Sequence, residues 1–200
     1  MAKKITAIVS LSIIGILILV TIIMANVDVN HKINCADPNY IYVQYGSGTS
    51  QYISGDDDIY SGILDRINNA SKESSLNALF AGTINDTPQV VTRSTTGSGY
   101  NPYSNSSAFY ITFNYNDAQK VKVGNKDYVD SSNENYYYKA LVFEVTANEG
   151  MQTVKVYIIP YYQNGTTTPN LDSNNYYRYY ELTADFSDLY SYLNDNGFNN

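Results

Sequence analysis

The strongest constraint on the fold is an uninterrupted apolar segment near the start of the chain. Residues 5–25, ITAIVSLSIIGILILVTIIMA, contain no charged side chain. About 20 such residues in a helix cross the roughly 30 Å hydrocarbon core of a bilayer. The segment therefore predicts a transmembrane helix that contacts membrane lipid.

The charges beside this segment predict its orientation. Lys3 and Lys4 precede it and Asp28 follows it, and lysines next to a span remain on the cytoplasmic side. A cleaved secretory signal is an alternative, although its apolar region is usually only about 7–15 residues long; a pilin-like or secreted surface subunit is another. We expect residues 1–4 to be a cytoplasmic tail, 5–25 a signal anchor in the cell membrane, 26–38 a juxtamembrane stalk and 39–200 one extracytoplasmic domain.

The part of the chain after the anchor is acidic. Removing Lys3 and Lys4 from the 12 basic residues leaves 10 against 19 acidic ones, a net charge of −9. Nucleic acids and anionic lipid surfaces are bound by clustered lysine and arginine. We therefore expect no nucleic-acid partner.

The chain contains few side chains that could support catalysis by imidazole or thiolate. His31 and Cys35 are the only histidine and cysteine, and both fall in the predicted stalk. Catalytic triads and zinc sites need these groups on a rigid scaffold. We expect no enzyme activity, no cofactor and no metal site. Cys35 has no partner within the chain, so the disulfide open to it is a dimer contact between two chains.

Carboxylates are the one catalytic group present in quantity. A glycosidase needs two of them facing each other, about 5–9.5 Å apart. No spacing selects such a pair among Asp57, Asp58, Asp65, Glu144 and Glu181. A carboxylate-based hydrolase of envelope polysaccharide therefore stands as the enzymatic alternative.

Apolar periodicity predicts an α+β domain. Strands are expected where apolar residues alternate or flank turn residues, at 39–45, 88–95, 108–115, 120–129, 136–147, 151–160 and 176–183. Helices are expected after the acidic residues 56–58, at 71–80, and after Asp185, where Phe186, Leu189, Tyr190 and Leu193 share one face. Gly62 lies inside the first helix, at a cost of about 1 kcal/mol relative to alanine. The order predicts a largely antiparallel sheet of about 5–7 strands with two or three helices packed on one side.

Tyrosine is the most unusual component, with 22 Tyr and no Trp. It is a strong strand former that packs its ring and keeps its hydroxyl wet, which accounts for part of this content. Helices cover one face of such a sheet, and tyrosines on the other face would form a binding surface with a nearby arginine. The candidate binding surface comprises Tyr40, Tyr42, Tyr136, Tyr138, Tyr176, Tyr177, Arg178, Tyr179 and Tyr180.

These observations together predict a single-pass, membrane-anchored extracytoplasmic protein of a microbial cell envelope. We expect it to be non-catalytic and to mediate protein–protein or surface-polymer interaction, with an envelope protein or a glycan as partner. Four Asn-X-Ser/Thr sequons are acceptor sites wherever a glycosylation route exists: they begin at Asn69, Asn85, Asn105 and Asn164.

Overall fold

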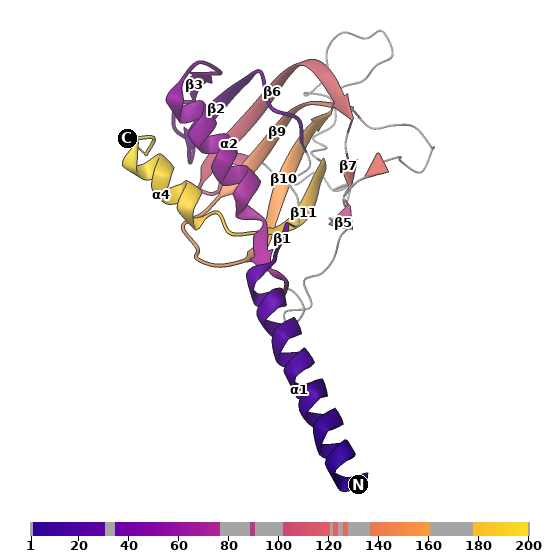
Figure 1. Ribbon diagram of the computed structural model, residues 1–200. Coiled ribbons are helices and arrows are strands. Elements are labelled where there is room, and N and C mark those ends of the chain that lie inside the picture. The colour runs from indigo at the N-terminus through magenta and orange to yellow at the C-terminus, as the bar shows by residue number, and fades with distance from the viewer. Residues whose placement is uncertain are drawn as a thin grey trace.

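The protein is an α+β molecule in which one long helix projects from a domain built on an antiparallel sheet (Figure 1). The predicted fold class is confirmed at this level. The computed structural model describes residues 2–30, 35–76, 89–90, 102–120, 122–123, 126–127, 137–160 and 178–199.

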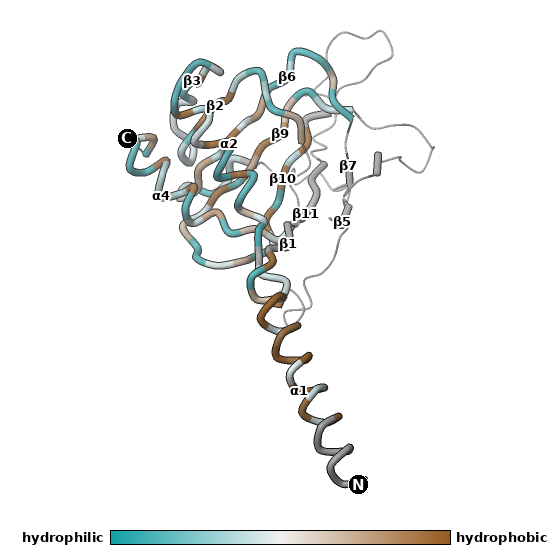
Figure 2. The backbone as a smooth tube through the Cα atoms, viewed as in Figure 1, coloured by the Kyte–Doolittle hydropathy of each residue, from teal (hydrophilic) through white to brown (hydrophobic). Residues whose placement is uncertain are grey.

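Helix α1 (Ala2–Asn26) is the projecting element. Its segment Val9–Asn26 has a mean hydropathy of 2.5 and is not buried by any other part of the protein. Apolar residues predominate along this segment, with paler ones between them (Figure 2), and Leu11 is 69 % exposed. A core helix would be covered by its neighbours. Length and composition make α1 a candidate membrane span or signal sequence.

The chain is fastened to the domain directly after α1. Strand β1 (Asp28–Asn30) pairs antiparallel with β4 (Lys72–Ser74), and the Ser75 amide donates to the Val27 carbonyl at 2.8 Å. We call this pairing the β1–β4 clasp. The helix expected over residues 71–80 is wrong at Lys72–Ser74, because β1 supplies a strand partner there. Residues 75–76 are helical, as expected, and residues 77–80 lie outside the described part.

A seven-stranded sheet forms the centre of the domain, and every neighbouring pair in it is antiparallel. The predicted hairpins at 136–147 with 151–160 and within 120–129 are confirmed, the second as the separate pair β7 (Lys122–Val123) and β8 (Lys126–Asp127). In spatial order the strands of the main sheet are β3 (Gln51–Ser54), β2 (Tyr40–Tyr45), β6 (Phe109–Lys120), β9 (Tyr137–Val145), β10 (Gln152–Pro160), β11 (Arg178–Ala184) and β5 (Gln89–Val90).

Helices α2 (Asp58–Ala70) and α4 (Ser187–Asp195) cover one face of this sheet (Figure 1). The alternation of apolar residues in β2 and β6 turns the predicted side chains inward, because successive strand residues point to opposite faces. The core on this face includes Ile41, Val43, Phe109, Ile111, Phe113, Ile63, Ile67, Leu189 and Leu193. Burying each of these large apolar side chains stabilises the fold by about 1.5–3 kcal/mol.

Gly62 explains how α2 and α4 pack so closely. A Cβ at this position would lie 2.7 Å from Cζ of Tyr192 on α4 and closer still to its hydroxyl oxygen. Arg66 holds the same ring from its face, with Cζ 3.8 Å from the ring centroid. Its guanidinium also donates to the Gly62 carbonyl at 3.1 Å and pairs with Asp188 at 3.2 Å. We call these four residues the Gly62–Tyr192 contact.

The opposite face of the sheet is also covered over part of its width. Tyr110 and Tyr157 are fully buried there with Ala108 and Val142. Tyr103 packs against them from the 3-10 helix η1 (Pro102–Ser104), with its ring centroid 5.0 Å from that of Tyr110. The expectation that tyrosines of this face are exposed is therefore wrong here: the rings form a second small core.

The segment that leads into the sheet is bound to the domain. The Tyr115 hydroxyl donates to the Ala36 carbonyl at 2.8 Å, and the Tyr60 hydroxyl donates to the Pro38 carbonyl. Cys35 is partly buried against the main core, and this burial raises the pKa of its thiol to about 12. Disulfide formation needs an accessible thiolate, so the environment of Cys35 disfavours the expected dimer contact.

Candidate functional site

Three tyrosines gather on the exposed part of the face opposite the helices. Tyr40 and Tyr42 lie on β2 and Tyr52 lies on β3, the last strand at this edge of the sheet. The ring centroids are 5.7 Å apart for Tyr40 and Tyr42, 5.6 Å for Tyr40 and Tyr52, and 5.7 Å for Tyr42 and Tyr52. Tyr42 is 37 % exposed and Tyr52 59 % exposed. We call Tyr40, Tyr42 and Tyr52 the tyrosine triad.

The hairpin between β2 and β3 creates the triad. Its register places Tyr42 directly opposite Tyr52, and residues paired in this way bring their side chains together on one face. Gly46 has φ +51° and turns the chain where a Cβ would lie 2.7 Å from the Ser106 carbonyl oxygen. The Ser50 hydroxyl then donates to the Gln44 side chain at 3.0 Å, which ties the two ends of the loop together.

The ring orientations make the triad a faceted surface. The planes of Tyr40 and Tyr42 meet at 86° and those of Tyr42 and Tyr52 at 65°, both edge-to-face. Such pairs are worth about 0.5–1.5 kcal/mol beyond the area they bury. The rings therefore support one another and present preorganised aromatic faces and edges.

Tyr138 does not belong to this surface, contrary to prediction. It is 3 % exposed and lies in the main core, with its ring centroid 5.4 Å from that of Tyr115. In the pairing of β9 with β10, Ala140 and Tyr138 face the consecutive residues Ile159 and Pro160, so β9 carries one extra residue, and a bulge of this kind moves a side chain to the other face. Burial raises the pKa of the Tyr138 hydroxyl well above its ordinary value.

Among the remaining predicted positions, those that the structure describes are separated from the triad. Tyr136, Tyr176 and Tyr177 lie outside the described residues. In β11, the backbones of Arg178, Tyr179 and Tyr180 pair with Ile158, Tyr157 and Val156 of β10. Strands β6, β9 and β10 lie between β2 and β11, so the members of the predicted surface that the structure describes do not form one continuous patch.

Charge is distributed unevenly around the triad. Residues 35–65 and 102–119, which include β2, β3 and most of β6, contain no lysine or arginine. Asp56 and Asp57 lie just beyond the end of β3. Asp117 is near the same end of the sheet, because the backbone amide of its neighbour Asn116 donates to the Asn39 side chain at 2.8 Å, and Asn39 precedes Tyr40. The chain segments that carry the triad are therefore acidic, with Asp37, Asp56, Asp57 and Asp117 in them, whereas Asp58 and Asp65 lie on α2, on the other face of the sheet, and β6 ends in a basic residue, Lys120.

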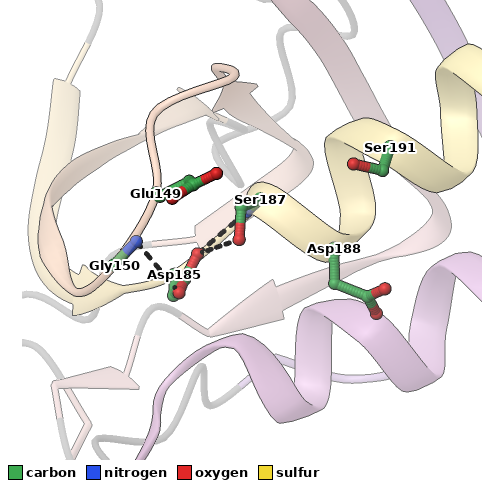
Figure 3. Close-up of a pocket in the computed structure, with 6 residues that line it drawn as sticks. All are labelled: Glu149, Gly150, Asp185, Ser187, Asp188 and Ser191. Carbon is green, nitrogen blue, oxygen red and sulfur yellow. Dashed lines mark hydrogen bonds between the residues drawn. The ribbon is translucent and has the colours of Figure 1, made fainter.

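An acidic hollow lies at the start of α4 (Figure 3). It is open, about 440 Å³ in volume, and lined by Glu149, Gly150, Asp185, Ser187, Asp188 and Ser191. The Asp185 carboxylate accepts hydrogen bonds from the Gly150 amide at 3.1 Å and from the Ser187 amide and hydroxyl at 2.9 and 2.6 Å. Asp188 pairs with Arg66. These two carboxylates therefore hold the fold together.

The carboxylates considered for hydrolysis lie elsewhere and apart. Glu144 accepts hydrogen bonds from the Tyr157 hydroxyl at 3.1 Å and the Asn105 amide at 3.4 Å, on the face opposite the helices. Asp57 precedes α2 and accepts from the Ser54 amide at 2.7 Å. Within the described part of the chain, no group of three or more His, Cys, Asp or Glu side chains is arranged to hold a metal ion.

Sequence reasoning identified two of the three triad residues. Tyr40 and Tyr42 followed from strand alternation, and their ring contact agrees with that expectation. Tyr52 was missed, because the four-residue strand Gln51–Ser54 is too short to show a period. The only available signal was its place after a Gly- and Ser-rich loop, which is typical of the return strand of a hairpin.

Comparison with protein-family models, with curated proteins and with solved structures finds no match for this chain.

Proposed function

We propose that this protein is a non-catalytic, single-pass membrane protein of a microbial cell envelope that binds a partner through the tyrosine triad. The observation that carries the proposal is a preorganised group of exposed aromatic rings at a sheet edge. Tyrosines suit binding surfaces because they lose little side-chain entropy and offer both an apolar ring and a polar tip. Nearly all other large aromatic side chains of the described part are buried or half-buried, whereas Tyr42 and Tyr52 are open.

The membrane role rests on α1. Its apolar side chains are uncovered over the whole of Val9–Asn26, and exposed apolar surface of this extent is stabilised by lipid or by a partner. Lys3 and Lys4 favour a cytoplasmic N-terminus, which would place the domain outside the cell.

Binding is favoured over hydrolysis by the state of the carboxylates. A glycosidase needs an acid and a base free to face the substrate. In the acidic hollow, Asp185 is saturated by backbone and hydroxyl donors and Asp188 is paired with Arg66.

Site-specific photocrosslinking in native membranes tests the binding role. Ser50 is exposed and lies two residues before Tyr52, so a p-benzoylphenylalanine placed there would reach a partner on the triad. The matched control is the same group at exposed Ser191 in the acidic hollow. We expect a defined crosslink from Ser50 that disappears in the Tyr42→Ala/Tyr52→Ala double variant, and none from Ser191. A Ser50 crosslink unchanged by the double variant would refute the assignment.

Orientation is tested by labelling with a membrane-impermeant maleimide. In a Cys35→Ser background, Ser191→Cys should react in intact cells, whereas Ala2→Cys should react only after lysis. Loss of residues 1–25 from the mature protein, measured by mass spectrometry, would replace the anchor by a cleaved signal.

A further inference from the structure

We propose that the ligand of the tyrosine triad is a basic polypeptide segment whose arginine or lysine side chains lie over the rings of Tyr42 and Tyr52. This inference rests on the proposed binding function and names the class of its partner. It follows from three features: ring exposure, the charge around the rings, and the state of the sheet edge.

Ring exposure makes the triad an acceptor for cations. The face of an aromatic ring carries negative potential, and a guanidinium or ammonium group within about 6 Å of the centroid is attracted to it. The protein already uses this interaction between Arg66 and Tyr192, where the guanidinium carbon lies 3.8 Å from the ring centroid. Tyr42 and Tyr52 offer the same chemistry at the surface, without a described arginine or lysine beside them.

The surrounding charge selects the sign of the ligand. Residues 35–65 and 102–119 contain six carboxylates and no basic side chain, and four of these carboxylates, Asp37, Asp56, Asp57 and Asp117, lie outside α2. Asp56 and Asp57 follow β3 at the end where Ser54 pairs with Tyr40, and Asp117 is held near Asn39 at the same end. An acidic rim attracts cationic partners, speeds their encounter and repels anionic polymers. It also disfavours a second copy of this acidic chain on the same surface.

The sheet edge indicates recognition by side chains. The Ser54 amide points away from β2, because it donates to the Asp57 side chain at 2.7 Å. Amides alternate in direction along a strand, so the Tyr52 amide also points away from β2. Within β3, Tyr52 is therefore the only residue whose backbone groups remain open to an added strand. An added strand would therefore gain very few backbone hydrogen bonds, and the aromatic face offers the larger contact.

Labelled peptides provide the test. The probe is an extended nonapeptide with arginine at alternate positions; its counterparts carry citrulline, which keeps the shape and removes the charge, or glutamate. Binding to the full-length protein in an uncharged detergent is measured by fluorescence anisotropy. We expect the arginine peptide to bind at least tenfold more tightly than the citrulline peptide, with no binding of the glutamate peptide. Raising the ionic strength from 0.05 to 0.5 M should weaken binding at least fivefold, because the Debye length shortens.

Variants locate the contact. Tyr42→Ala and Tyr52→Ala should each weaken arginine-peptide binding about two- to fivefold, the effect of one exposed cation–π contact. Tyr52→Phe should bind as the natural protein does, because the ring remains. The half-buried Tyr137 on β9 is the control, and Tyr137→Ala should change nothing. Circular dichroism melts confirm that the variants are folded.

Several results would overturn the inference. Equal binding of the arginine and citrulline peptides, displacement of the arginine peptide by dextran, or no effect of the two alanine variants would each do so. If the Ser50 crosslink still depends on the triad in those cases, the proposed function stands and only the basic partner is wrong. If the crosslink is independent of the triad, both are wrong.

Discussion

Replacing Gly62 by alanine should destabilise the protein, although helix propensity alone predicts the opposite. Gly62 lies inside α2, where alanine is favoured over glycine by about 1 kcal/mol. The added Cβ would lie 2.7 Å from Cζ of Tyr192, about 1 Å inside normal contact between carbon atoms. Either the two helices separate or the Tyr192 ring leaves its place.

The cost of that movement can be worked out from the Gly62–Tyr192 contact. Overpacking in a filled interior costs about 1–3 kcal/mol. Displacing the ring from the Arg66 guanidinium forfeits a further 0.5–1 kcal/mol or so. The lower end of the overpacking range applies, because Gly62 and Tyr192 are half-buried and the clash is with the free end of the side chain. After subtracting the propensity gain, Gly62→Ala should lower the free energy of unfolding by about 0.5–1 kcal/mol.

A double-mutant cycle with Tyr192→Ala isolates the cause, using urea unfolding of the full-length protein in detergent followed by circular dichroism. Without the Tyr192 ring, Gly62→Ala should become stabilising by about 0.5–1 kcal/mol. Asn68→Ala, on the exposed side of the same helix, should be mildly stabilising in both backgrounds. If Gly62→Ala stabilises the protein equally with and without Tyr192, the packing argument is wrong.

Three further substitutions test other contacts. Between about pH 7 and 9 the Cys35 thiol should leave stability unchanged, and above pH 9 stability should fall, because burial raises the pKa of this thiol from 9.0 to about 12 and the unfolded chain loses its proton first; the slope for this group is about 1.4 kcal/mol per pH unit between those values. Cys35→Ala should remove that slope in urea melts from pH 8 to 11, leaving the part due to Tyr138, Tyr60 and Tyr190, whose pKa values are also raised, and an unchanged slope would contradict the assignment. Tyr115→Phe deletes the hydrogen bond to the Ala36 carbonyl and should cost about 0.5–1.5 kcal/mol while increasing the rate at which Ellman's reagent modifies Cys35; an unchanged rate would mean that this bond does not hold the segment in place. Asp185→Ala should lower stability by about 1–3 kcal/mol, since three donors lose their acceptor, whereas Ser191→Ala in the same hollow should be neutral in thermal unfolding.

Local periodicity was sufficient to predict the architecture. Phe109, Ile111 and Phe113 alternate into the core as expected, and Leu189 and Leu193 turn the last helix onto the sheet. These patterns work because strand and helix geometry fix the direction of each side chain from its neighbours alone.

What failed depended on partners distant in the sequence. The inward turn of Tyr138 accompanies a bulge of β9 against β10, which no pattern within β9 reveals. The strand at Lys72–Ser74 exists because Asp28–Asn30 lies beside it. From the sequence, Gly62 only weakens its helix; in the structure, Tyr192, 130 positions later, occupies the space that a side chain at Gly62 would take.

The same limit applies to the candidate site. Tyr40 and Tyr42 could be paired from alternation, but Tyr52 joins them only through the register of the hairpin. Tyr110 and Tyr157 have the same local pattern as exposed tyrosines, yet they are buried. Which tyrosines are open depends on what covers the sheet, and that is a property of the whole fold.

The β1–β4 clasp limits the distance between the domain and the end of α1. A free coil of about 13 residues would give a root-mean-square separation of roughly 20 Å and let the domain tumble. The clasp begins two residues beyond Asn26, so only Val27 separates the helix from the first paired residue. Where α1 lies in a bilayer, the domain is carried as a rigid arm at one height above the lipid. A partner of the tyrosine triad, as proposed above, would then be met at a nearly constant distance from the bilayer.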